Sequence, residues 1–277
     1  MKFFLFVLIL FIMNTVLYAK ESGYSISTAL VGMSMDYREY DDQDVILDSE
    51  KSTFKSGLLV GVDLNFAYTK VFESGNYSKI GVNLKILNGE TEYVGSLLNS
   101  SCNSYGCYVS KSQNSIFDTD LKYKYSHIIK NAFSLNYGIG VGYRSWKREL
   151  SVTQIEVYKW LSIRPKVGFS YDLSKFRLGM CIEYQYGINP QMTILADAEN
   201  PDTTVNLGAA NIIQVSIPFN LSLTENIELF VEYIYENQSI DKSNTAPFII
   251  NGKEESILEP KSTANNQYAK FGVVFKF

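Results

Sequence analysis

Residues 133–144 read FSLNYGIGVGYR and alternate strictly between two kinds of residue. The apolar set is Phe133, Leu135, Tyr137, Ile139, Val141 and Tyr143, and the intervening set is Ser134, Asn136, Gly138, Gly140, Gly142 and Arg144. Successive side chains of a β-strand point to opposite faces, so a period of two indicates a strand with one apolar and one polar face. The stretch therefore predicts such a strand.

The same period recurs along the chain from Lys20 onward and predicts ten strands. We place them, to within a few residues, at 24–40, 54–70, 78–95, 115–127, 133–150, 157–173, 175–189, 210–223, 226–240 and 266–277. The connections after the even-numbered strands are short, such as SK at 174–175 and TEN at 224–226. Those after the odd-numbered strands are mostly long, such as 189–209 and 241–265.

An even number of two-faced strands with alternating loop lengths is typical of a barrel in a bacterial outer membrane. Lipid cannot satisfy free backbone groups, so such a sheet must close. A soluble β-sandwich would bury its apolar faces against each other and would need no alternation of loop length. Residues 20–277 therefore resemble an all-β, closed antiparallel up-and-down transmembrane β-barrel of about ten strands, in contact with outer-membrane lipid and lipopolysaccharide.

The two ends of the chain carry targeting patterns. Lys2 precedes an apolar run and a small residue at Ala19, which predicts a secretory signal peptide over residues 1–19. The last predicted strand is similar to the signal that the barrel-assembly machinery recognises in its clients, through Tyr268, Val273, Phe275 and Phe277. The resemblance implies an outer-membrane location, assembly by that machinery, and periplasmic N- and C-termini.

Charge and cysteine content exclude several classes of partner. The chain has 25 Lys and Arg against 29 Asp and Glu, and no basic stripe, which argues against a nucleic-acid partner. Cys102 and Cys107 suit a local disulfide in an oxidising compartment, whereas Cys181 is expected to remain an unpaired thiol in a strand. With no histidine or second cysteine pair beside them, we expect no metal site, and no sequence motif indicates a cofactor.

If the apolar faces point outward, charged residues of both signs point into the lumen. The expected lumen network is Asp36, Arg38, Asp63, Lys85, Asp118, Asp120, Lys122, Lys124, Arg144, Arg148, Arg164, Lys166, Asp172, Arg177, Glu183, Glu228, Glu232, Glu236 and Lys270. Such residues either pair into a polar core that stiffens the barrel or line a narrow channel for small polar solutes. We do not expect an open porin-like pore, because such a pore needs about 16 strands.

A ten-stranded surface barrel resembles the omptin proteases in architecture. That family uses an Asp pair opposite an Asp-His pair, and the resemblance offers Asp118 and Asp120 as candidates for the first pair. The lone histidine, His127, follows Asp120 on the same strand at a distance of roughly 20 Å, so the catalytic set is incomplete.

The fold does not choose among the functions that barrels of this size perform. We expect a structural or surface-interaction role, adhesin-like, in which the long loops bind a surface ligand. The alternatives are a narrow channel and an omptin-like surface protease.

Overall fold

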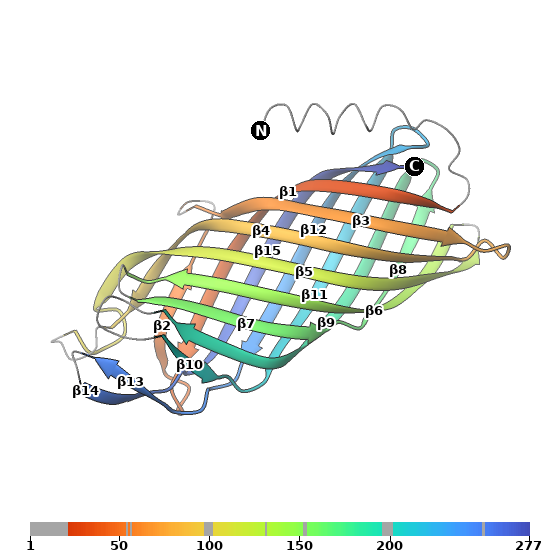
Figure 1. Cartoon of the computed structure of the whole chain (residues 1–277). Helices are drawn as coiled ribbons and strands as arrows, with labels where there is room; N and C mark the ends of the chain where they lie inside the picture. The colour runs from red at the N-terminus through yellow and green to blue at the C-terminus, as the bar shows by residue number, and fades with distance from the viewer. Residues whose placement is uncertain are drawn as a thin grey trace, which may run out of the picture.

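The computed structural model describes residues 22–53, 55, 57–96, 102–130, 132–151, 154–195, 202–250 and 253–277, and its strands form one long barrel (Figure 1). The strands are β1 (Gly23–Tyr40), β2 (Ile46–Lys51), β3 (Leu59–Val71), β4 (Tyr77–Gly95), β5 (Tyr108–Lys130), β6 (Phe133–Glu149), β7 (Ile155–Ile163), β8 (Lys166–Leu173), β9 (Phe176–Ile194), β10 (Thr203–Asn206), β11 (Ala210–Ser222), β12 (Ile227–Ile240), β13 (Ala246–Ile250), β14 (Lys253–Ile257) and β15 (Lys261–Lys276). The predicted signal peptide, residues 1–19, lies outside the described residues. No helix within the described ranges is long and apolar enough to cross a membrane.

Ten antiparallel strand positions close into a ring. The ring runs through β1, β3, β4, β5, β6, β8, β9, β11, β12 and β15 and returns to β1. The seam pairs β15 with β1 over their whole length, with Ser25 opposite Lys276 and Tyr40 opposite Lys261. The fold is therefore a closed antiparallel up-and-down transmembrane β-barrel, as predicted.

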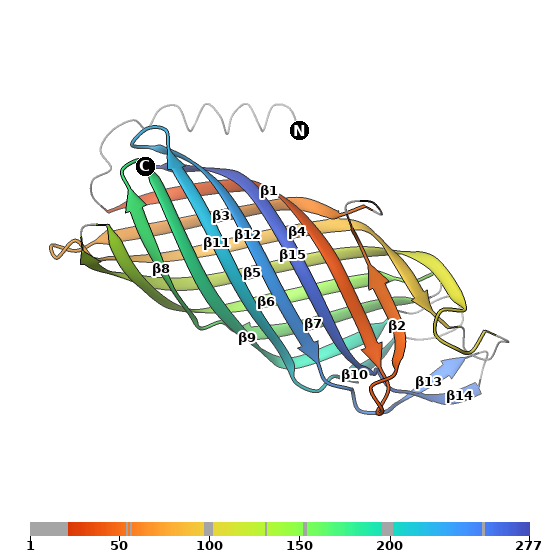
Figure 2. The same ribbon diagram turned by 180° about the vertical axis from the view of Figure 1, so that it is seen from behind.

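The two ends of the barrel differ in their connections. At the end where β1 begins and β15 ends, here called the terminal end, the turns span only residues 72–76, 131–132, 174–175 and 223–226. The opposite end, here called the loop end, carries the longer connections, including the β13–β14 hairpin and the short strands β2 and β10 (Figures 1 and 2). This asymmetry matches the alternation of loop lengths in the sequence.

Several segments that the sequence analysis assigned to loops are strands. β2 pairs with β1 and β4 and so prolongs the ring position of β3, while β10 pairs with β9 and prolongs that of β11. β5 starts at Tyr108 and β15 at Lys261, earlier than predicted. The reason is that backbone pairing continues toward the loop end after the outward face has become polar, so the sequence loses its alternating signal there.

One predicted strand, 157–173, is divided into β7 and β8 at Pro165. Proline has no backbone N–H to donate to the sheet. The ring stays intact at the break because Arg164 and Gly140 exchange two backbone hydrogen bonds, of 2.8 and 3.0 Å, and Tyr184 donates to the Pro165 carbonyl at 3.0 Å. β7 and β8 therefore act as one member of the ring.

An apolar belt surrounds the terminal part of the barrel. On β6 the outward residues are apolar or aromatic from Leu135 to Tyr143, and then become Ser145, Lys147 and Glu149. These nine residues match the roughly 9 to 11 that cross a bilayer in a barrel. On the other strands the outer face within the belt is apolar apart from Thr28 and Thr119, and toward the loop end it becomes polar at Ser34, Asn88, Ser115, Lys159, Gln191, Asn211, Asn237 and Gln267. Beyond them the barrel projects past the belt toward the loop end.

The interior of the projecting part holds the main apolar core. It includes Met33, Leu87, Ile116, Trp146 and Trp160, all at most 5% exposed. Within the belt, by contrast, the inward positions are mostly polar or glycine. The barrel thus has apolar residues outside where lipid would lie and inside where water surrounds it.

Candidate functional site in the barrel lumen

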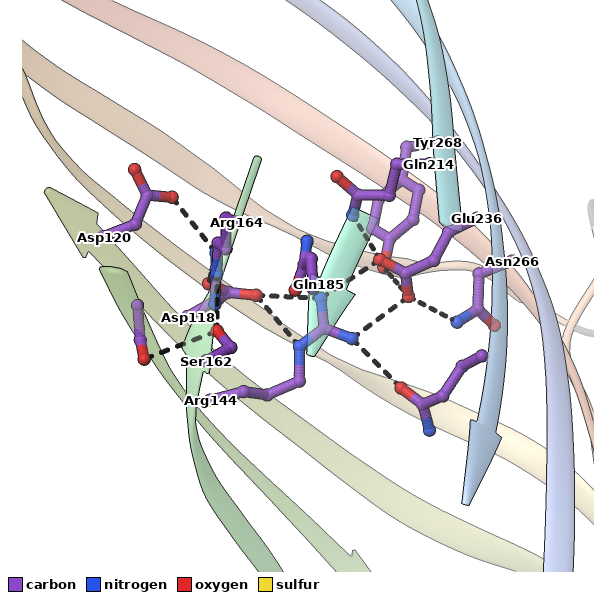
Figure 3. Close-up of polar contacts among 12 residues, drawn as sticks. Asp118, Asp120, Arg144, Ser162, Arg164, Gln185, Gln214, Glu236, Asn266 and Tyr268 are labelled. Carbon is purple, nitrogen blue, oxygen red and sulfur yellow. Dashed lines mark hydrogen bonds and ion pairs between the residues drawn. The ribbon is translucent and has the colours of Figure 1, made fainter. Parts of the chain in front are cut away.

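Five buried charged side chains cross the lumen and are here called the Arg144 layer: Asp118, Asp120, Arg144, Arg164 and Glu236 (Figure 3). Arg144 on β6 donates from Nε to Asp118 Oδ2 on β5 at 2.9 Å, and from Nη1 and Nη2 to the Glu236 carboxylate on β12 at 3.1 Å. Arg164, just after β7, donates to Asp118 at 2.9 Å and to Asp120 at 3.2 Å. The layer therefore ties opposite walls of the barrel together.

Neutral side chains complete the bonding of the buried carboxylate of Glu236. Asn266 donates to it at 2.9 Å, the Tyr268 hydroxyl at 3.1 Å, and Gln214 also donates to it. A buried ion pair repays its desolvation only when its remaining lone pairs are hydrogen-bonded, which these donors achieve. The Arg144 layer is therefore a preorganised structural network.

The glycines within residues 133–144 leave space for these long side chains. A Cβ atom at Gly142 would lie 2.3 Å from Arg164 Cζ, and one at Gly140 would lie 2.6 Å from Lys122 Cγ. Any larger residue would collide with the guanidinium or the lysine stem. The glycines on the inner face of β6 therefore allow basic side chains from neighbouring strands to lie across it.

A second charged cluster lies nearer the loop end and is here called the Arg148 layer: Arg148 with Glu39, Glu50, Glu156 and Glu259. Arg148 is 1% exposed, and its guanidinium contacts Glu39 at 2.8 Å, Glu50 at 2.8 Å and Glu156 at 2.9 Å. It also receives support from aromatic rings, with its Cζ 4.4 Å from the centre of Tyr37. One guanidinium thus forms ion pairs with several buried carboxylates from distant parts of the chain.

The apolar core separates the two charged layers. Trp146 stacks on Tyr158 with ring centres 5.1 Å apart and meets Tyr37 edge-on at 5.1 Å. Its indole N–H donates to Asn114 at 2.7 Å, and Asn114 donates in turn to Glu50 at 2.8 Å. The core and the Arg148 layer are therefore one packed unit.

Carboxylates outnumber the cation in the Arg148 layer, which changes their protonation. Burial, together with repulsion from Glu39, raises the pKa of Glu156 above its usual value and raises that of Glu259 well above it. The Tyr158 hydroxyl hydrogen-bonds to Glu259. Both carboxyls therefore bind protons more tightly in the folded chain than in an unfolded one.

We expect Glu259→Gln to stabilise the protein increasingly as the pH rises. A carboxyl with a raised folded-state pKa contributes stability that is fully present below its unfolded pKa and is lost as the pH rises through its folded pKa. The amide cannot ionise, so the difference in free energy of unfolding between variant and wild type should grow from pH 5 to pH 8, by up to about 1.4 kcal/mol per pH unit. Urea titrations at several pH values measure this difference, with the exposed Glu92→Gln as control. A difference independent of pH would contradict the assignment of a buried proton to this layer.

The prediction that Asp36 and Arg38 face the lumen was wrong. Both lie on the outer face of β1, where they form an ion pair of 3.0 Å with each other. The inward neighbours are instead Tyr37 and Glu39, both buried. Polar residues were expected to face inward, a rule that holds inside the lipid belt but fails for these two residues in the projecting part.

Most of the other predicted lumen residues lie on the inner face between the Arg144 layer and the terminal end. They pair with one another as Lys122 with Asp120 at 3.2 Å and Glu183 at 2.9 Å, Lys270 with Asp63 at 2.8 Å and Glu232 at 3.4 Å, and Arg177 with Asp172 at 2.5 Å. Glu228 pairs with Lys276, which was not among the predicted residues, at 2.6 Å. Lys85 lies over the Tyr268 ring, 4.7 Å from its centre. Lys124 and Lys166 also line the lumen there.

Sequence reasoning missed the four glutamates of the Arg148 layer. Glu39 is an even number of residues from Ser25 and Ala29, which face inward nearer the start of the same strand. Strand alternation alone could therefore have predicted that Glu39 faces inward. Glu259 lies outside any strand and close to none of its partners in sequence. Only tertiary structure brings it to Tyr158.

The candidate protease residues do not form a catalytic arrangement. Asp118 and Asp120 lie well inside their strand, because β5 extends ten residues beyond Asp118 toward the loop end, and both carboxylates are held by guanidinium groups. His127 is exposed on the outer face. Within the described ranges no group of His, Cys, Asp and Glu is arranged to hold a metal ion.

The cysteines and the carboxy-terminal residues lie as follows. Cys102 and Cys107 form a disulfide in the loop before β5, and Cys181 is a free thiol on β9. Tyr268 of the expected assembly signal points into the lumen, where it donates to Glu236. Phe277 exchanges backbone hydrogen bonds with Tyr24 at the seam.

No protein-family model and no curated protein sequence matches the chain. Among solved structures, the outer membrane protease OmpT from Escherichia coli matches with a TM-score of 0.58, covering 95% of this chain and 99% of that chain at 13% sequence identity. The translocator domain of the autotransporter NalP from Neisseria meningitidis covers 92% of this chain and 88% of that chain, with a TM-score of 0.45 and 8% identity. The OmpT match has a TM-score above 0.5 and indicates a shared fold. At 13% sequence identity it indicates nothing about activity. The chain therefore has the fold of the bacterial outer-membrane β-barrels, in the ten-stranded form that its sequence resembles.

Proposed function

We propose that this protein is a non-conducting β-barrel of a bacterial outer membrane, which presents its loops as an interaction surface outside the cell. The observation that carries the proposal is the filled lumen. The Arg144 layer and the Arg148 layer both cross it, and buried aromatic and aliphatic side chains pack between them. In this arrangement the terminal end faces the periplasm.

The filled lumen argues against the narrow channel. A conducting path needs continuous water, whereas Arg148, Tyr158, Glu236 and Met192 are each at most 1% exposed. Arg148 and Glu236 also form ion pairs inside the barrel, so neither charge is free to draw an ion through. Opening a path would require breaking several buried ion pairs at once.

The projecting loop end supports the interaction role. Beyond the belt the outer face is polar, and the connection between β12 and β15 carries the β13–β14 hairpin outside the ring (Figure 1). Lys242 and Lys261 anchor this region to the first loop by ion pairs with Asp42 and Asp44. A stiff barrel below and tethered loops above suit a surface that binds a partner, and loops on such scaffolds commonly carry function.

Two measurements test the proposal, one on purified protein and one on cells that display it. Folded protein in planar bilayers should show no stepwise conductance, with heat-modifiable migration in gels verifying that the sample is folded. Regular single-channel steps would overturn the non-conducting assignment.

Cells that display the protein provide the second measurement. Replacing residues 246–257 by a Gly-Ser linker of equal length should abolish adherence to host-cell monolayers or cell-to-cell aggregation, whichever the wild type confers. The Cys102→Ser/Cys107→Ser variant, which alters a different loop, should reduce it less. If displayed wild-type protein confers neither property, the interaction role fails.

A further inference from the structure

A cavity of about 690 Å³ occupies the terminal half of the lumen. Its closed end is the Arg144 layer, and residues at the ends of strands, such as Gly23, Val71 and Lys276, surround its mouth. Nine Lys and Arg side chains line it, against six Asp and Glu. A chain that is acidic overall thus concentrates an excess of positive charge in this cavity.

Four of these lysines make no ion pair among the described residues. One, Lys85, lies over the Tyr268 ring, and the other three, Lys79, Lys124 and Lys166, are neighbours on the barrel wall. Within the described part of the chain, none of them has a carboxylate within 4.0 Å, whereas Lys122, Lys270 and Lys276 are all paired. Lys124 has instead the ring of Tyr77, 5.4 Å from its Nζ. The excess charge is therefore not cancelled by the protein.

The strand register places the three lysines side by side. Lys79 on β4 is opposite Lys124 on β5, and Gly138 on β6 is opposite both Lys124 and Lys166 on β8. With no side chain at Gly138, the lysine stems can converge; a Cβ there would lie 3.1 Å from Lys166 Cε. One ring level of the barrel thus presents three ammonium groups to one space.

At the closed end of the cavity, Arg164 adds a further donor. Its side chain is 2% exposed and lines the cavity, and its Nη2 has no hydrogen-bond partner among the described residues. Buried donors without partners are rare in folded proteins. This atom and the three lysines all favour a ligand that accepts hydrogen bonds and carries negative charge.

We propose that Lys79, Lys124 and Lys166 form a binding site for a small phosphate-bearing anion that enters through the terminal end of the barrel. Lysine binds phosphate as a point charge, and several lysines around one space favour a multiply charged group. A volume of about 690 Å³ lies within the usual range of small-molecule sites. The site is independent of the loops, so its failure would leave the proposed surface role untouched.

The free thiol of Cys181 provides a built-in reporter, because it lines the same cavity. We expect an anionic methanethiosulfonate reagent to modify it at least about tenfold faster than a cationic one of similar size, since a favourable interaction of about 1.4 kcal/mol changes a rate or equilibrium tenfold. Pyrophosphate should slow the modification at constant ionic strength, where an equivalent amount of sodium chloride does not. Equal rates for both reagents, with no protection by pyrophosphate, would overturn the proposal.

The triple variant Lys79→Gln/Lys124→Gln/Lys166→Gln should remove both the reagent preference and the protection. Because the three lysines make no ion pair among the described residues, the variant should still fold, which heat-modifiable migration checks. The matched control, Lys111→Gln/Lys147→Gln/Lys159→Gln, removes the same charge from the outer face and should behave as wild type. Protection that persists in the triple variant would show that the site lies elsewhere.

A direct binding measurement tests the site even if the Cys181 thiol does not react with the reagents. Phosphorus NMR of pyrophosphate should show line broadening with wild type and with the outer-face control, but at least about tenfold weaker binding to the triple variant. Repeating the thiol assay in vesicles of phosphatidylcholine with and without phosphatidylglycerol distinguishes the source of the phosphate. Protection by the anionic lipid alone identifies a headgroup ligand, protection by pyrophosphate alone a soluble one, and protection by neither contradicts the site.

Discussion

Replacing Arg148 by Met is expected to lower the free energy of unfolding by about 3 to 5 kcal/mol at pH 7, the usual cost of removing one partner from a buried ion pair. Met fills much of the same volume, so the loss is electrostatic. The substitution leaves Glu39, Glu50 and Glu156 buried without the cation that contacts all three at 2.8 to 2.9 Å. The projecting part of the barrel should unfold first.

Urea-induced unfolding in detergent, followed by gel migration and tryptophan fluorescence, measures this loss. The deficit should shrink at pH 5, because burial already raises the pKa of Glu156 and of Glu259, and carboxyls that take up protons no longer need the cation. Lys147→Met is the matched control, since its side chain is next in sequence but 38% exposed on the outer face. Equal stability of the Arg148 variant and this control at pH 7 would refute the role of the Arg148 layer.

The second large effect is expected at the ion pair of Arg144 and Glu236. Arg144→Met leaves Glu236 buried at 0% exposure, and Glu236→Leu leaves three donors and a guanidinium without their shared acceptor. Each should cost about 3 to 5 kcal/mol. The double variant should cost less than the sum by about 1 to 3 kcal/mol, because the second change removes the group that the first left unpaired.

An ion pair on the surface provides the control for this cycle. Lys111 and Glu90 are 2.7 Å apart, closer than Arg144 and Glu236, but their side chains are 74% and 44% exposed. Solvent screening should make their coupling unmeasurable. Additive effects at Arg144 and Glu236, or equal coupling in the two cycles, would mean that burial does not determine the strength of these pairs.

The sequence predicts which face of the sheet a residue occupies wherever one face meets apolar lipid and the other meets the polar lumen. In β6 the alternation from Phe133 to Tyr143 predicted both the strand and its outward face. The same rule failed for Asp36 and Arg38, which lie beyond the belt. There water surrounds the barrel, so apolar Met33 and Met35 point inward and the charged residues point outward.

The partners of the lumen charges could not be predicted, even where their inward direction could. Asp118, for example, pairs with Arg144 and Arg164, neither of which lies on its own strand. A strand's own periodicity says which face a residue occupies, but it does not say which residue from another wall shares its height on the barrel axis. Register and shear determine that height.

By itself, the sequence determined the all-β class, the ten ring positions, the alternation of turns and loops and the closing role of the last strand. Each follows from local chemistry, because a residue in lipid, in the lumen or in a turn must suit its surroundings. Only the tertiary structure decided that the lumen is closed by two charged layers and that three lysines remain uncompensated in the cavity below. Those features depend on which side chains from separate strands meet, and closure of the sheet alone brings them together.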